Sequence, residues 1–126
     1  MLIEYESSKS IEALKEALEE KSKAKNFGVL TVHDISKTLE TKGFPISYKC
    51  LILEICSPKF AKIVLEKNPE VSTALPCRIA IYEKKDKRIV ASLSPRLLIE
   101  MFQAPQLYKI AEEVESILKE IMQEAL

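Results

Sequence analysis

The amino-acid sequence predicts an α+β fold, in which a mainly antiparallel sheet carries helices on one face. Strand-like runs and helical patterns follow one another in the order strand, helix, several strands, helix, and a charged hairpin signal joins two of the strand-like runs. The last helical pattern has an apolar stripe broad enough to lie across a sheet. No linker or low-complexity segment divides the chain, so we expect one domain, residues 1–126.

The N-terminal part begins with a strand candidate, Leu2–Glu6, in which apolar and acidic residues alternate. The apolar stripe of a first helix follows, made of Ile11, Leu14, Ala17 and Leu18. We expect this helix to end within Lys21–Lys25, which has no apolar stripe. A second strand is predicted at Phe27–Ile35. The polar segment Ser36–Ile46, which holds a glycine and a proline, is predicted to be a loop.

The central stretch contains two strand-like runs, Tyr48–Cys56 and Cys77–Tyr82, on either side of a short helical pattern. Ser57-Pro58 predicts the start of that helix, because serine can cap the free N–H groups and proline suits the first helical position. Asn68-Pro69 predicts its end, since the residue before a proline is pushed out of the α region.

The C-terminal part continues with a charged hairpin turn, residues 84–87, into a strand at Arg88–Leu93. We interpret the charges as a solvated turn rather than a nucleic-acid patch. Ser94-Pro95 then predicts a short helix, Pro95–Phe102. The final helix has apolar residues at helical spacing from Leu107 to Ile121.

Side-chain alternation along the strands predicts which residues share a face of the sheet. We expect one face to be the helix-covered core: Leu30, Val32, Leu51, Leu53, Ile55, Ile79, Ile81, Ile89, Ala91 and Leu93. The opposite face would then hold Val29, Thr31, His33, Ile52, Glu54, Arg78, Ala80, Tyr82, Val90 and Ser92. This mixture is too apolar for bare solvent and too polar for a core. It predicts a homodimer interface or a cleft for a small-molecule ligand.

The overall composition narrows the classes of partner. Lysine plus arginine equals aspartate plus glutamate, at 19 each, which disfavours a general nucleic-acid binder. No stretch is long and apolar enough to cross a membrane, and we see no secretory signal. The three cysteines form no even disulfide framework, so we expect reduced thiols and a cytoplasmic location.

Three short motifs, in order and in register, resemble a known family: Phe27-Gly28-Val29-Leu30-Thr31, Cys56-Ser57-Pro58 and Leu75-Pro76-Cys77. The sequence is similar to the bacterial and archaeal domain-of-unknown-function family 302 over nearly its whole length. The resemblance implies a curved antiparallel sheet with a TATA-binding-protein-like fold, and a homodimer. It implies no activity. The family usually has an asparagine where Ser57 stands, which alters any side-chain role there. Fold similarity to the TATA-box binder transfers no function.

Two cysteines are candidates for a thiol site. Cys56 precedes a predicted helix N-terminus, where the helix dipole favours a thiolate, and Cys77 begins a strand. If their strands are antiparallel neighbours, the two residues lie near each other, as a thiol-dependent enzyme or a redox- or metal-responsive protein would need. The simpler interpretation is two small buried apolar residues. There is no CxxC motif and no four-ligand zinc set, so no structural metal is predicted.

The other candidate site residues are polar. His33 is the only histidine, but the sequence places no nucleophile beside it, and a strand histidine with an ordinary partner is the simpler interpretation. Glu54, Arg78 and Tyr82 share the mixed face, where they can hold a polar ligand or make hydrogen bonds across a subunit boundary. No phosphate-binding glycine loop or catalytic triad pattern is present. The sequence therefore identifies neither a catalytic set nor a cofactor.

Overall fold

Five strands form a single sheet, with helices before, between and after them. The computed structural model describes residues 1–126. The strands are β1 (Leu2–Ser7), β2 (Gly28–Asp34), β3 (Cys50–Cys56), β4 (Cys77–Lys84) and β5 (Lys87–Leu93). The helices are α1 (Ile11–Ala24), α2 (Ile35–Thr41), α3 (Pro58–Lys67), α4 (Pro95–Met101) and α5 (Tyr108–Ala125), with short 3-10 helices η1 (Pro69–Ala74) and η2 (Pro105–Leu107).

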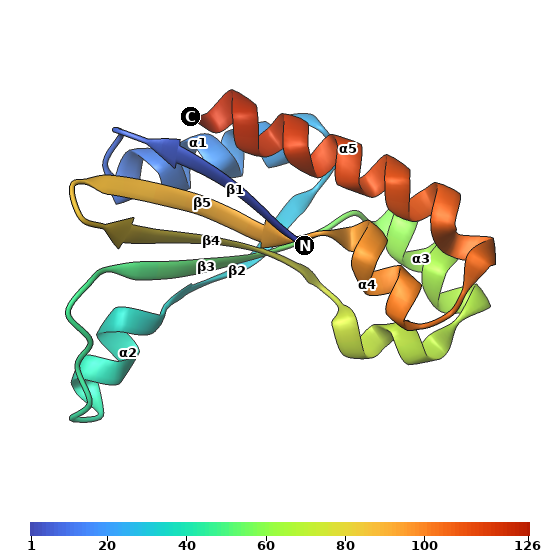
Figure 1. Ribbon diagram of the computed structural model, residues 1–126, viewed down its shortest axis with the longest axis horizontal. Helices are drawn as coiled ribbons and strands as arrows, with labels where there is room; N and C mark the ends of the chain where they lie inside the picture. Colours follow the sequence, from blue (N-terminus) through green and yellow to red (C-terminus); the bar gives the residue numbers. More distant parts are fainter.

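The sheet has the order β1-β5-β4-β3-β2, and every neighbouring pair is antiparallel. The first strand therefore lies at one edge, beside the last (Figure 1). Residues 85 and 86 form the two-residue turn between β4 and β5, where the sequence predicted a hairpin. The predicted α+β class, with an antiparallel sheet, is confirmed.

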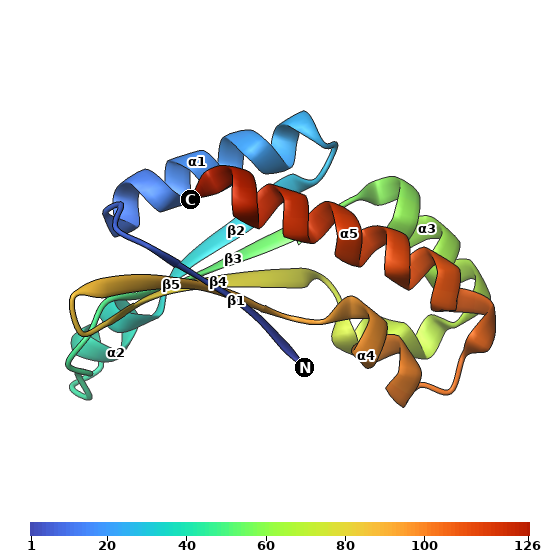
Figure 2. The ribbon, with the colours of Figure 1, turned by 45° about the horizontal axis from the view of Figure 1, so that its top comes forward.

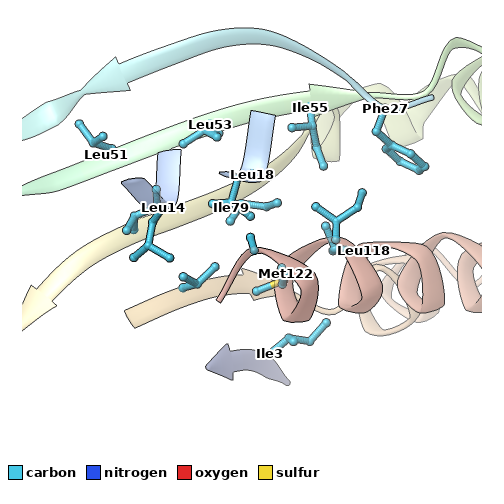
Figure 3. Close-up of a cluster of buried hydrophobic side chains, with 14 of the residues drawn as sticks. Ile3, Leu14, Leu18, Phe27, Leu51, Leu53, Ile55, Ile79, Leu118 and Met122 are labelled. Carbon is cyan, nitrogen blue, oxygen red and sulfur yellow. The ribbon is translucent and has the colours of Figure 1, made fainter. Parts of the chain in front are cut away.

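The main core lies between the sheet and helices α1 and α5. Figure 2 shows both helices above the sheet, with no helix lying across the face below it. Leu14 and Leu18 of α1 and Leu118 of α5 are fully buried against strand residues such as Leu53 and Ile79 (Figure 3). The predicted position of the last helix on the Leu51, Leu53 and Ile55 face is thus correct.

Helices also extend beyond both ends of the strands (Figures 1 and 2). At one end, α3, η1, η2, α4 and the first part of α5 enclose a second, smaller cluster of buried apolar residues: Val64, Val71, Ile99, Ala104, Leu107 and Ala111. At the other end, α2 contributes no buried residue. The protein therefore has a large core on one face of the sheet and a small one past the strand ends.

The prediction of the faces was reversed throughout β5, since Ile89 pairs with Tyr82 of the open face and Ser92 pairs with the core residue Ile3. Val90 is fully buried in the main core, whereas Ala91 pairs with Ala80 and lies on the open face. Residues 89–91 are all apolar, so alternation alone could not choose between the two faces. The pairing register with β1 and β4 decides it, since a shift by one residue moves every side chain to the other face.

The prediction was also wrong for two residues of β2, because the strand contains a bulge. Val29 pairs with Ile55 and Thr31 with Glu54, so Leu30 has no partner of its own. Val29 therefore packs against the main core, and Leu30 is exposed. An extra residue of this kind reverses the alternation on one side of it.

One of the two remaining helix predictions needs correction. The segment Ser36–Ile46 was predicted to be a loop, but α2 occupies its first half. The Asp34 carboxylate caps this helix by accepting a hydrogen bond of 3.0 Å from the Lys37 amide, and Gly43, with φ of 88°, follows its end. The first helix ends at Ala24, within the predicted range Lys21–Lys25.

The serine caps differ from one another. Ser94 accepts a hydrogen bond of 3.2 Å from the Leu97 amide, as expected for the start of α4. Ser57 makes no such bond, although α3 begins at Pro58 as predicted. The α3 start therefore depends on the proline and on packing rather than on a side-chain cap.

Candidate functional site

The open face of the sheet carries the polar residues that the sequence singled out. On β3, Ile52 and Glu54 alternate with core residues. On β4, Arg78, Ala80 and Tyr82 likewise alternate with core residues. The pairing register places Glu54 opposite Arg78 and Ile52 opposite Ala80. The central strands thus present a mixed surface on the face that α1 and α5 leave uncovered (Figure 2).

His33 and Glu54 form a direct contact on this face. His33 Nε2 lies 2.8 Å from Glu54 Oε1, and the two side chains come from the neighbouring strands β2 and β3. The histidine side chain is 44% exposed, so the pair contributes at most about 1 kcal/mol to stability. Its main consequence is that the Glu54 carboxylate already has a partner.

Arg78 has a different situation. It stands opposite Glu54 in the register, yet its guanidinium group forms no hydrogen bond and has no carboxylate within 4.0 Å. Its backbone carbonyl is engaged, since it accepts a hydrogen bond of 2.8 Å from the Ser92 hydroxyl. Arg78 is therefore an unpaired cation on the open face.

Tyr82 contacts the edge strand. Its hydroxyl donates to Glu4 Oε2 over 3.4 Å. Burial raises the pKa of Tyr82, and the nearby Glu4 carboxylate raises it further, because both disfavour the phenolate. Tyr82 is thus a neutral hydrogen-bond donor rather than a nucleophile.

The ladder between β4 and β5 ends at the pair Ala80 and Ala91. Beyond it, the Ser92 hydroxyl bridges to the backbone of Arg78, and the two strands lead to η1 and α4. A hollow of about 470 Å³ lies there, which we call the open-face groove. Its lining consists of Leu2, Ile52, Thr73, Ala74, Pro76, Cys77, Arg78, Ala80, Tyr82, Ala91, Ser92, Leu93, Pro95 and Leu98.

A smaller apolar cavity of about 70 Å³ lies among the elements past the strand ends, and we call it the end cavity. It is lined by 19 residues, of which 16 are hydrophobic and none is charged. They include Phe27, Cys56, Phe60, Ala61, Val64, Leu107 and Val114. Five residues line both hollows: Ala74, Pro76, Cys77, Pro95 and Leu98. The groove and the end cavity therefore adjoin.

The two candidate cysteines both line the end cavity. Cys77 pairs with Ile55 in the register, one residue from Cys56, and all cysteines are free thiols. Burial raises the pKa of Cys77 to about 11, with a further contribution from Cys56, so its thiol is neutral near pH 7. No group of three or more histidine, cysteine or acidic side chains is arranged to hold a metal ion.

The structure thus divides the predicted site residues into two groups. His33 and Glu54 are in contact, and Arg78 and Tyr82 line the open-face groove. Cys56 lines only the end cavity, while Cys77 lines both hollows.

Several groove residues were missed by the sequence analysis. Leu2 was assigned no site role, and Ala91 and Leu93 were placed on the wrong face of β5. Thr73 comes from η1, a 3-10 helix that the sequence analysis did not predict. The pairing of Leu2 with Leu93 across β1 and β5 could not be inferred, because these are the first and the last strands in the sequence.

Comparison with protein families finds a match over residues 3–125 to the model described as domain of unknown function DUF302. The chain belongs to this DUF302 family. Its structure matches the crystal structure of an uncharacterized conserved DUF302 protein from Bacillus stearothermophilus, with a TM-score of 0.96 and 30% sequence identity. The match covers 99% of this chain and 98% of the other. No curated protein matches the chain. None of its helices is long and apolar enough to cross a membrane.

Proposed function

We propose that this DUF302 protein is a small-ligand-binding module whose site is the open-face groove together with the end cavity. The observation that carries the proposal is that the two hollows share five lining residues, so that only this shared wall separates a ligand in the groove from the end cavity. Small-molecule sites are typically concave and mostly apolar, with a few polar groups that fix orientation. The groove fits this description, since nine of its 14 lining residues are hydrophobic.

The energetics of the end cavity support the same proposal. Protein interiors are close-packed, whereas the apolar side chains around this hollow of about 70 Å³ lack neighbours on one side. The cavity lies in the smaller core, between η1, α4 and α5, where a ligand can recover the missing contacts. An apolar group entering it leaves no buried charge unpaired, because no charged residue lines it.

The test uses Nile red, a neutral apolar dye whose emission rises and shifts to the blue in apolar sites. We expect saturable binding to the wild type and a loss of at least tenfold in affinity for Ala80→Trp, which fills the groove. The matched control is Ala24→Trp, at an exposed position on α1 that lines neither hollow. Absence of dye binding, or equal binding by Ala80→Trp, contradicts the proposal.

We also propose that the protein is a homodimer that uses the open face. Leu2 and Leu93, which are opposite each other in the register, are 48% and 58% exposed there. A second copy covering them would also close the groove from solvent. A cytoplasmic location is part of the proposal, because the free cysteines suit a reducing compartment.

The proposal includes a TATA-binding-protein-like classification of the curved sheet, which the family resemblance implies. It does not include DNA binding. The equal numbers of acidic and basic residues, 19 each, give no general attraction to phosphates.

The alternative is a thiol-dependent enzyme or a redox- or metal-responsive protein that uses Cys56 and Cys77. In its favour, both cysteines line one cavity. Against it, the pKa of Cys77 is raised by burial to about 11, which keeps this thiol in its unreactive form near pH 7. We therefore favour the binding module.

A further inference from the structure

We propose that the ligand class of the open-face groove is a monocarboxylic acid with a short unbranched alkyl chain. Its carboxylate would pair with Arg78, and its chain would extend along the groove into the end cavity. This inference rests on the proposed binding function and adds the chemistry of the ligand to it.

The charge of the groove indicates that the ligand carries a single negative charge. Arg78 is the only charged residue in the lining, and its guanidinium group has no partner in the structure. Arginine binds carboxylates through two parallel N–H···O bonds, and an apolar surround strengthens such a pair. One unpaired arginine balances one negative charge. A doubly charged phosphate would leave a net negative charge beside Glu54, which stands opposite Arg78.

The remaining polar groups of the groove are already engaged. The Thr73 hydroxyl donates to the Glu70 carbonyl at 2.9 Å, and the Ser92 hydroxyl donates to the Arg78 carbonyl at 2.8 Å. The Tyr82 hydroxyl donates to Glu4. Arg78 is therefore the one strong contact available to a polar ligand group, and the rest of the ligand should be apolar.

The end cavity sets the length of the chain. Its volume of about 70 Å³ is roughly half that of an engineered apolar cavity that binds benzene, so it accepts about two or three carbon atoms. The groove, with about 470 Å³, holds the carboxylate and the rest of the chain. An acid of about six to ten carbons fits within the two volumes together, with its last two or three carbons in the end cavity.

The experiment compares octanoate, 1-octanol and octylamine at pH 7 by isothermal titration calorimetry. We expect octanoate to bind at least tenfold more tightly than octanol, and octylamine to show no binding. Arg78→Gln should weaken octanoate binding at least tenfold and leave octanol binding unchanged, as expected for loss of a charge-assisted hydrogen bond. Arg88→Gln, on the same sheet but outside the groove lining, is the matched control and should bind octanoate like the wild type.

A second variant tests the position of the chain. Ala61 lines the end cavity but not the groove, and Ala61→Phe should fill the cavity. We expect it to weaken octanoate binding at least tenfold and hexanoate binding less. If Ala61→Phe binds octanoate as tightly as the wild type does, the alkyl chain of the ligand lies elsewhere, and the inference that it enters the end cavity is overturned.

The outcomes separate the two proposals. If Nile red binds but octanoate and octanol bind with equal affinity, the carboxylate inference is overturned and the binding-module proposal is retained. The same holds if Nile red binds but Arg78→Gln does not change the affinity for octanoate. Failure of Nile red, octanoate and octanol to bind overturns both. Because Arg78 is exposed and makes no side-chain contact through its guanidinium group, its variants should fold, which circular dichroism checks.

Discussion

Glu115 of α5 accepts a hydrogen bond from the hydroxyl of Ser94, the residue that caps α4. The same carboxylate oxygen lies 3.3 Å from the Arg96 amide, so a single buried side chain satisfies two donors at the start of another helix. Lys119 is 3.5 Å from the other oxygen and supplies a positive charge. This contact fixes α4, and with it the wall shared by the open-face groove and the end cavity.

Removal of this carboxylate should destabilise the protein. We expect Glu115→Ala to lower the free energy of unfolding by about 1–3 kcal/mol, because it leaves buried donors of Ser94 and Arg96 without a partner. Urea denaturation measures this change. Glu112→Ala, an exposed neighbour on the same helix, is the control and should change stability by less than about 0.5 kcal/mol. Equal effects of both variants would mean that the contact does not stabilise α4.

The same residue predicts a pH dependence. Burial alone would raise the pKa of Glu115, but the hydrogen bonds from Ser94 and Arg96 and the charge of Lys119 lower it below its ordinary value of 4.5. A lowered pKa means that the stabilisation is present above pH 4.5 and is lost as the pH falls through the folded-state value. Glu115→Gln should therefore have a flatter stability profile below pH 4.5, measured by urea unfolding at several pH values. Parallel profiles would contradict this assignment.

The packing of α5 gives a prediction for the main core. Leu118 is fully buried, whereas Ile117 is only partly buried. Leu118→Ala should cost about 2–5 kcal/mol, from lost burial and the remaining cavity, and Ile117→Ala should cost clearly less. Thermal or urea unfolding of the two variants checks the order. The reverse order would mean that α5 is rotated relative to the sheet.

The proposed dimer is tested at the centre of the open face. Ala80→Glu places a carboxylate between Ile52 and Ala91, where a second copy would have to bury it. We expect the molar mass from light scattering to halve. Ala24→Glu, at an exposed position on α1, should leave it unchanged. An unaffected oligomer of Ala80→Glu would place the interface elsewhere.

The cysteines should differ in their rates of alkylation. Burial raises the pKa of Cys50, and Asp34 raises it further, while the pKa of Cys77 reaches about 11. We expect Cys56 to react first with iodoacetamide at pH 7 and Cys77 last, as measured by mass spectrometry of the native protein. Earlier labelling of Cys77, or resistance of all cysteines until unfolding, would make Cys56 a packing residue and remove the thiol-dependent alternative.

The sequence predicted the elements better than the faces. The faces of β3 were assigned correctly, because its one charged residue, Glu54, indicates the open face. In β5, Val90 and Ala91 are adjacent apolar residues, so only the pairing with other strands determines which of them is buried. The loop prediction for α2 failed for another reason, since Asp34 and Gly43 were helix boundary signals that the polar composition obscured.

The candidate site was harder to predict than the fold. His33 and Glu54 were both chosen from the sequence, but their contact at 2.8 Å depends on the register after the bulge in β2. The end cavity is lined by residues that are distant from one another in the sequence, such as Phe27, Phe60 and Leu107. No local pattern encodes a volume left between such elements, because it depends on how closely they pack.

The bulge at Leu30 also bears on aggregation. β2 is an outer strand, and a regular outer strand offers free N–H and C=O groups to which a strand of another molecule can add. The register of β2 shifts between Val29 and Thr31. A strand of another molecule that began to pair at Val29 would therefore find the N–H and C=O groups out of register at Thr31. The exposed side chain of Leu30, which would otherwise favour association at this edge, lies at the point where such pairing is interrupted. The bulge thereby opposes fibril growth along this edge.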